Sequence, residues 1–417
     1  MLGDVPLDLE ALAGVIRTST PEAPRLRFPA GAKGFCHADS GYGRKIAADR
    51  CEMREDVIQY LYHSAGGGEM KQKRIEDYGI HIGRLPRGER NKISDVPGVT
   101  VGHATIRDER HNTGVTVIQP SEGNIFRDKL VAASFVHNGF GKTAGTVQID
   151  ELGTLETPIA LTNTLNVGAV SDAVVAWMLR RCEEDGIALR SVNPVVGECN
   201  DASLNAIADR AVTAEHVFEA LRTASADFEE GAVGAGAGTT CYGLKGGIGS
   251  ASRVITLDGR DCTVGVLVQS NYGATADLQI NGEPVGQEIS RRIRGEACDQ
   301  GSIMVILACD VPLTARQLRR VIRRCSVGIA RCGSYIGHGS GEIFLGFSTA
   351  NVIRPGDGDM LSFTAVREDR LDRLFRAAGE ATEEAILNSM VTAKETAAPD
   401  GHIVRSLGDC LEARLKN

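Results

Sequence analysis

The pair Gly301-Ser302 stands where a charged stretch of the sequence meets an apolar one. Residues 287–300 contain six charged side chains, whereas residues 303–309 read IMVILAC, which is typical of a strand buried on both faces. A glycine at this point permits the backbone strain and close approach that an N-to-O acyl shift requires. Cutting the 301–302 bond would place a free α-amine, with an ordinary pKa of about 8, beside the Ser302 hydroxyl, where it can act as a base. Taken alone, the pattern is more typical of an ordinary loop-to-strand junction than of a cleavage site.

Other motifs that could carry chemistry are incomplete. Residues 141–143 read GKT like the end of a phosphate-binding loop, but Val136 occupies the place of that loop's first glycine. The alternating glycines of 234–238 lack the spacing of a dinucleotide fingerprint. The nine histidines show no H-E-x-x-H spacing, and no G-x-S-x-G elbow is present. A second Gly-Ser pair, 249–250, has no abrupt switch into an apolar run and is the weaker candidate for cleavage. We therefore expect no metal and no cofactor.

The elements that must position Ser302 alternate between apolar strands and amphipathic helices from about residue 95 onward. Strands are expected at 115–118, 130–137, 159–164, 303–309 and 343–347, with a hairpin of 253–257 and 263–269 around the turn-forming residues 258–261. Helices are expected at 168–182, from a capping box of Thr314 and Gln317 to about residue 329, and at 368–393. Strands gathered into sheets, with helices over their outer faces, make an α+β layered sandwich.

Composition narrows the class of protein. The 417 residues carry a formal charge of −8, which offers no basic face to a nucleic acid or to an anionic membrane. The longest apolar runs are far shorter than the ~20 residues of a bilayer span, and the start of the chain shows no secretory signal pattern. The eleven cysteines are scattered without a C-x-x-C pair, which favours reduced thiols and a cytoplasmic location.

Residues 1–69 differ from the rest of the chain. They mix short polar runs with prolines and end in three consecutive glycines, and a helix around 54–63 is the only clear element. We interpret 1–69 as an N-terminal extension and 70–417 as a single catalytic domain.

Seven ordered segments resemble the family of L-aminopeptidase/D-esterases and β-peptidyl aminopeptidases, which are self-processing N-terminal-serine hydrolases. They are 91–106, 158–170, 195–205, 233–253, 264–273, 301–320 and 339–351. The resemblance implies a four-layer αββα sandwich similar to the N-terminal-nucleophile hydrolases, with a different chain path. It also implies an aminopeptidase cut into 70–301 and 302–417, and a homotetramer of such heterodimers.

The resemblance also implies roles for individual residues. Gly301 and Ser302 fall on the cleavage site, with Ser302 as nucleophile, and Ser340 with Glu342 falls on a catalytic Ser-x-Glu pattern. Asn271 matches the oxyanion donor, whose amide would stabilise a tetrahedral intermediate. Glu198 matches the carboxylate that recognises the free amino group of the substrate, which would explain exopeptidase action.

The resemblance leaves substrate and chemistry partly open. Asn200 stands where some members carry a tyrosine, which favours the β-peptidyl branch. Expected substrates are small peptides, aminoacyl amides or esters, without a choice among β-, L-α- and D-residues. One alternative is an acyltransferase of the ornithine acetyltransferase type, but that branch uses threonine at the cut and Ser302 counts against it. The other is an unprocessed, non-enzymatic homologue that serves in binding or assembly.

Overall fold

The computed structural model of this protein describes residues 72–293, 301–356 and 359–415. The helix expected around 54–63, and the rest of the expected extension, lie outside the described residues. So do residues 294–300, which precede the candidate cleavage site.

A six-stranded sheet contains β11, the strand to which Ser302 belongs. Its strands in spatial order are β4 (Thr154–Leu155), β3 (Lys129–Gly139), β12 (Ser340–Ile353), β11 (Gly301–Cys309), β10 (Arg260–Asn271) and β9 (Gly247–Leu257). β11 and β12 run parallel, and the other neighbours are antiparallel. The apolar run predicted as a strand buried on both faces is thus an interior strand.

A second, four-stranded sheet packs on one face of the first. Its strands in order are β1 (Thr100–Arg107), β2 (Asn112–Gln119), β5 (Ile159–Asn163) and β6 (Val195–Cys199). One apolar core holds side chains of both sheets, among them Met304 and Ile306 of β11 and Val196 of β6. The two sheets approach each other closely at Gly197 of β6, where a Cβ atom would lie 2.4 Å from Cε of Met304 on β11. β6 is therefore held directly against β11.

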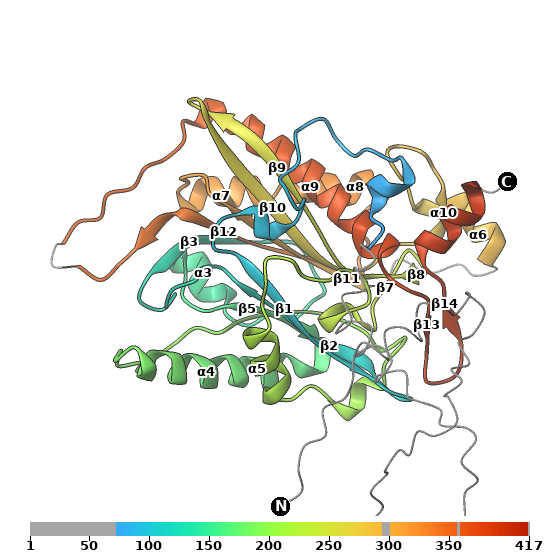
Figure 1. Ribbon diagram of the computed structural model, residues 1–417, viewed down its shortest axis with the longest axis horizontal. Helices are drawn as coiled ribbons and strands as arrows, with labels where there is room; N and C mark the ends of the chain where they lie inside the picture. Colours follow the sequence, from blue (N-terminus) through green and yellow to red (C-terminus); the bar gives the residue numbers. More distant parts are fainter. Residues whose placement is uncertain (1–71, 294–300, 357–358, 416–417) are drawn as a thin grey trace, which may run out of the picture. The chain divides into compact units, whose positions relative to one another are not determined.

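Helices cover the outer faces of both sheets (Figure 1). α7 (Ala315–Ile322), α8 (Cys325–Arg331) and α9 (Asp372–Val391) lie over the six-stranded sheet, and α4 (Val167–Glu184) and α5 (Ala214–Arg222) over the four-stranded one. The resulting four-layer αββα sandwich is the predicted fold class. No helix in the described part of the chain is long and apolar enough to cross a bilayer.

Smaller elements complete the domain. They are α3 (Thr146–Leu152), α6 (Gly286–Ile293), α10 (Leu407–Leu415) and two short two-stranded sheets, β7 (Thr240–Cys241) with β8 (Leu244–Lys245), and β13 (Thr396–Ala397) with β14 (Ile403–Val404). The predicted hairpin and the Thr314 capping box are both present. The helix expected to run on from Thr314 to about residue 329 is two helices, because the chain leaves the helix at residues 323–324 between α7 and α8.

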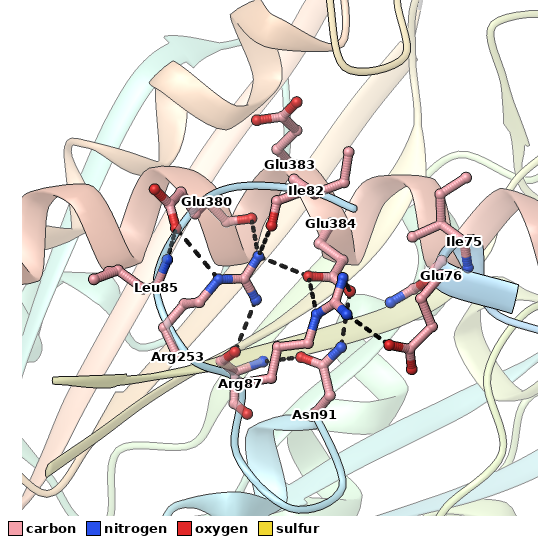
Figure 2. Close-up of polar contacts among 12 residues, drawn as sticks. Ile75, Glu76, Ile82, Leu85, Arg87, Asn91, Arg253, Glu380, Glu383 and Glu384 are labelled. Carbon is pink, nitrogen blue, oxygen red and sulfur yellow. Dashed lines mark hydrogen bonds and ion pairs between the residues drawn. The ribbon is translucent and has the colours of Figure 1, made fainter. Parts of the chain in front are cut away.

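The long C-terminal helix differs from its prediction in burial. An amphipathic helix with one inward stripe was expected, whereas α9 is buried from Ala377 to Val391 on all sides, including Glu380 and Glu384. The sheet covers one side of α9, and residues 74–91 cover another (Figure 2). Periodicity could not show this second cover, because the covering segment lies near the other end of the described part of the chain.

Charged partners satisfy the buried glutamates of α9. Arg253 of β9 lies between them, with Nη2 2.6 Å from Glu384 and Nε 3.5 Å from Glu380 (Figure 2). From the covering segment, Arg87 Nη2 lies 2.9 Å from Glu384, and Asn91 donates to the same carboxylate at 2.8 Å. We call these five residues the helix-side ion cluster. It joins the sheet, α9 and the covering segment through fully or largely buried charges.

Candidate active site

Ser302 is the second residue of β11 and is buried, with 4% of its surface exposed. It pairs with Asn271 at the end of β10 on one side and with Gly341 at the start of β12 on the other. Residues that pair across a sheet share a face, and Met304, the next residue on that face of β11, lies in the core between the sheets. The side chains of Ser302 and Asn271 therefore share the inter-sheet face, although they belong to segments well separated in the sequence.

The residue before Ser302 must be a glycine. A Cβ atom on Gly301 would lie 1.9 Å from the carbonyl oxygen of Asn271 and 3.1 Å from Cα of Tyr272. Both obstacles are main-chain atoms, one at the end of β10 and one in the residue after it, so they cannot move aside as a flexible side chain would. The Cα atom of Gly301 thus lies against the end of β10.

The Ser340 hydroxyl donates a hydrogen bond to Oε1 of Glu342, and both residues are fully buried. They stand immediately before and after Gly341, the partner of Ser302. Alternation along β12 places both side chains on the side of Phe344, which belongs to the core beneath the helices. The pair therefore lies one strand away from Ser302, on either side of the residue that Ser302 pairs with.

The turn that leads into Ser340 has its own clamp. Nδ2 of Asn138, on β3, donates hydrogen bonds to the carbonyl oxygens of Gly337 at 2.9 Å, His338 at 3.3 Å and Ser340. Three acceptors on one amide group hold the start of β12 beside Gly301. Sequence reasoning missed Asn138, because nothing local connects it with a turn so much later in the chain.

The amide group of Asn271 has a defined orientation. Its Oδ1 accepts the backbone N–H of Thr240 at 2.9 Å, and the residue is buried, with 7% of its surface exposed. With the oxygen anchored in this way, the Nδ2 end is the one available as a donor toward the inter-sheet face. Gln269, two residues earlier, faces the same way and donates to carbonyls of Thr162 and Ala235 across the gap between the sheets.

Glu198 lies on β6 with its carboxylate held by neutral donors. Oε1 accepts the backbone N–H of Lys142 at 2.9 Å, and Oε2 accepts the hydroxyl of Thr164. A Cβ atom on Gly141 would lie 3.7 Å from Oε1 of Glu198 and 3.8 Å from Cα of Gly341, so this loop links the carboxylate to the start of β12. The GKT triplet, which is not a phosphate loop, thus has a place beside Glu198, and sequence reasoning missed it together with Thr164.

Cys199 connects the strand of Glu198 with that of Ser302. Its thiol donates to the carbonyl oxygens of Gln269 at 3.3 Å and Ser302 at 3.5 Å. Complete burial raises the pKa of the Cys199 thiol, so it stays protonated and acts as a donor. Glu198 is therefore one residue away from an atom that contacts the candidate nucleophile. Asn200, by contrast, is exposed, and its side-chain oxygen accepts a local bond from the backbone of Ala202.

The competing pair at 249–250 lies inside β9. The Ser250 hydroxyl donates to the carbonyl of Val266 at 2.6 Å and accepts the N–H of Ile93 at 2.7 Å. These contacts give Ser250 a structural place in the middle of a strand.

Comparison with known proteins identifies the family of this chain. The sequence profile of peptidase family S58 matches residues 91–404, about three quarters of the chain. This chain belongs to peptidase family S58. The S58 chain is 38% identical over 368 residues to the β-peptidyl aminopeptidase BapA of Sphingosinicella microcystinivorans, which covers 82% of this chain and 91% of that protein.

Solved structures resemble the S58 chain over most of its length. A β-aminopeptidase of Burkholderia sp. is 40% identical, with a TM-score of 0.76 over 82% of this chain and 98% of that one. The L-aminopeptidase D-Ala-esterase/amidase of Ochrobactrum anthropi is 35% identical, with the same TM-score and the same coverage, and is described as a variant among the Ntn hydrolase fold. The predicted family and fold class are confirmed, and the chain is an aminopeptidase and hence a hydrolase.

Proposed function

We propose that this S58 aminopeptidase cleaves its own chain between Gly301 and Ser302, and then uses Ser302 as the nucleophile of an acyl-enzyme mechanism. The observation that carries the proposal is the position of Ser302 at the start of an interior strand, opposite Asn271 and beside the Ser340–Glu342 hydrogen bond. A nucleophile, an amide donor and a carboxylate-bound hydroxyl thus meet at the ends of three neighbouring strands.

Self-cleavage converts one catalytic domain into two chains. The Ser302 oxygen attacks the carbonyl carbon of Gly301, the C–N bond breaks, and the nitrogen leaves as the α-amine of Ser302. Water then hydrolyses the ester, which returns the hydroxyl to Ser302 and a carboxylate to Gly301. Of the 417 residues, 417 − 301 = 116 remain in the chain that begins with Ser302. The catalytic domain of 70–417 is then made of 70–301 and 302–417.

Turnover repeats this chemistry on a substrate carbonyl. The α-amine of Ser302 takes the hydroxyl proton, and the Ser340–Glu342 pair holds and polarises that amine from the adjacent strand. The Nδ2 group of Asn271 donates to the oxyanion that develops when the Ser302 oxygen attacks. The oxyanion then collapses, the bond to the leaving amine or alcohol breaks, and the leaving group takes the proton held by the α-amine of Ser302. Water hydrolyses the acyl-enzyme, which releases the acid and restores the Ser302 hydroxyl.

Glu198 recognises the amino terminus of the substrate. Its carboxylate is buried and bonded to neutral donors, and among the residues that the structure describes no lysine or arginine side chain pairs with it. A buried carboxylate without a cation costs free energy, and the ammonium group of a substrate would offset that cost. This favours removal of the first residue over cleavage within a chain.

The proposed substrate class rests on the names of the relatives. The names of the similar proteins specify β-peptidyl and L-aminoacyl or D-alanyl substrates, so we propose small peptides, amides and esters with a free amino group, β-aminoacyl ones among them. We further propose a homotetramer of processed heterodimers and a cytoplasmic location. The tetramer rests on the family resemblance, and the location rests on the cysteine pattern of the sequence.

N-terminal sequencing of the purified protein tests the cleavage. We expect two bands on a denaturing gel, the smaller beginning Ser-Ile-Met-Val. Ser302→Ala should run as one chain and lose at least about 10⁴-fold in kcat on an aminoacyl amide, since the nucleophile is removed. The matched control is Ser250→Ala, which loses mid-strand hydrogen bonds but should still cleave. A single uncut chain with full amidase activity would refute the mechanism, and a fragment beginning at Ser250 would refute the choice of junction.

A further inference from the structure

Lys245 is a fully buried lysine close to the candidate site. It ends β8, and its Nζ donates to the carbonyl oxygens of Thr239 at 2.7 Å, Gly246 at 2.8 Å and Gly236 at 2.9 Å. An ammonium group has three protons, so these three carbonyls match its full donor capacity. All three belong to the same glycine-rich segment, residues 236–246, which we call the glycine loop.

The glycine loop carries the group that orients Asn271. The backbone N–H of Thr240, next to Thr239, donates to Oδ1 of Asn271 at 2.9 Å. Two residues later the N–H of Tyr242 donates to the carbonyl of Tyr272 at 2.7 Å. The loop is thus attached both to the side chain of Asn271 and to the main chain that follows it. A shift of the loop would turn the amide group that faces Ser302.

We propose that Lys245 is a positioning residue for the oxyanion donor: its ammonium group holds the glycine loop so that the N–H of Thr240 keeps the Asn271 amide turned with Nδ2 toward Ser302. The inference rests on the oxyanion role proposed for Asn271. It adds a residue that contacts neither the substrate nor the nucleophile and acts through one backbone N–H.

Burial of the Lys245 amino group costs desolvation free energy. Burial, and to a smaller extent the guanidinium of Arg107, lower the pKa of Lys245 to about 7, although the carboxylate of Asp201 acts to raise it. A methionine would fill a similar volume without the desolvation cost of a buried ammonium. A methionine would, however, take the ammonium donor away from all three carbonyls. Those of Gly236 and Thr239 would keep bonds from Thr239 and Gly246, but the Gly246 carbonyl would lose its Lys245 donor, so the loop would be held less firmly.

A kinetic double-mutant cycle tests the proposal. The variants are Lys245→Met, Asn271→Ala and the combination, with Lys245→Gln as a milder change that keeps two amide protons for the carbonyls. Release of nitroaniline from L-alanyl and β-alanyl 4-nitroanilides gives kcat and KM. Rates are divided by the amount of the cleaved chain that begins with Ser302, so that incomplete self-cleavage does not affect the comparison. Lys92→Met is the matched control, because Lys92 also donates to a backbone carbonyl, that of Phe228 at 2.6 Å, but outside the glycine loop.

We expect Lys245→Met to lower kcat by roughly ten- to a hundredfold with KM changed less than about threefold, since a small misplacement of a catalytic group costs about this much. Lys245→Gln should show a smaller loss of the same kind, and Lys92→Met should leave kcat unchanged. When Asn271→Ala is already present, adding Lys245→Met should lower kcat by less than about threefold.

Three results separate the possible failures. If Lys245→Met lowers kcat by the same factor with and without Asn271, Lys245 acts on the structure as a whole and the inference is wrong. If both Lys245 variants fold with unchanged kcat while Asn271→Ala is impaired, the inference is again wrong but the oxyanion proposal stands. If Asn271→Ala itself has a normal kcat, the oxyanion proposal fails, and the inference fails with it.

Discussion

The helix-side ion cluster and the candidate active site are both sets of buried polar groups, but their groups are satisfied in different ways. In the cluster, Arg253 and Arg87 meet Glu380 and Glu384 directly, and each cation has a carboxylate within 2.6 to 3.5 Å (Figure 2). At the site, Glu198 and Asn271 are held by backbone N–H groups, with a hydroxyl in addition on Glu198.

This difference separates a structural polar cluster from one suited to chemistry. Opposite charges that neutralise each other within the fold have little capacity left for a ligand, and they join the elements that carry them. Neutral backbone donors fix the orientation of a carboxylate or an amide without cancelling its charge or using its second function. In the proposed mechanism, the negative charge of Glu198 and the Nδ2 donor of Asn271 are the groups that bind the substrate.

The largest effect is expected for Arg253→Met, which tests whether the helix-side ion cluster stabilises the fold. Removing the cation leaves Glu380 and Glu384 buried with one partner fewer, which costs about 3–5 kcal/mol of stability. Urea unfolding of the uncut Ser302→Ala chain measures this without subunit dissociation, and kcat of the variant with Ser302 intact should be unchanged well below its melting temperature. Arg316→Met, at an exposed pair with Glu368, is the control and should change the stability little.

A result in which Arg253→Met keeps its stability but loses kcat would reverse the assignment of the two regions. The cluster would then act on the chemistry, and its burial would not be needed for the fold.

A smaller effect, confined to catalysis, is expected for Glu198→Gln. The variant keeps the size of the side chain and one acceptor but loses the charge, which is worth ~1.5–3 kcal/mol against an ammonium group, so kcat/KM for aminoacyl amides should fall roughly ten- to a hundredfold. Self-cleavage involves no free amino terminus and should proceed, whereas Glu342→Ala should impair both cleavage and turnover. Gel analysis and parallel kinetics with amides and N-acetyl-amides measure these effects.

The N-acetyl substrates, which carry no charge, should be poor for the wild type and no worse for Glu198→Gln. Glu156→Gln is the matched control, because Glu156 is also buried and accepts a backbone N–H, that of Asn193 at 2.9 Å, but it already pairs with Lys129. Equal slowing of both substrate types by Glu198→Gln would mean that Glu198 supports the structure, as the cluster glutamates do.

The smallest effect is expected from removing residues 1–69. A chain that begins at Met70 keeps the contacts of Gln72 and Arg74 with Glu230, including an ion pair of 2.8 Å, and should fold, cleave itself and keep its kcat within about twofold. Thermal unfolding and N-terminal sequencing check this. A chain that begins at Ile75 loses those contacts and should melt earlier. Failure of the Met70 chain to fold would show that the segment 1–69 is part of the catalytic domain.

The sequence by itself determined the local elements and the family. Neighbouring residues were enough to predict the strand at 303–309 after a charged stretch, the Thr314 capping box and the hairpin turn at 258–261. These features depend on hydrophobic patterns and turn residues within a few positions of each other. Ordered motifs along the chain were enough to predict the αββα sandwich.

Only the tertiary structure decided which residues orient the site and how α9 is covered. The N–H of Thr240 on Asn271, the Thr164 hydroxyl on Glu198 and the Asn138 clamp before Ser340 join positions that are distant in the sequence. Register decided that Ser340 and Glu342 flank the main chain of Ser302, because a parallel ladder sets which residues face each other and the pleat sets which side they take. Such contacts depend on how strands and layers pack, and no periodicity within one segment records them.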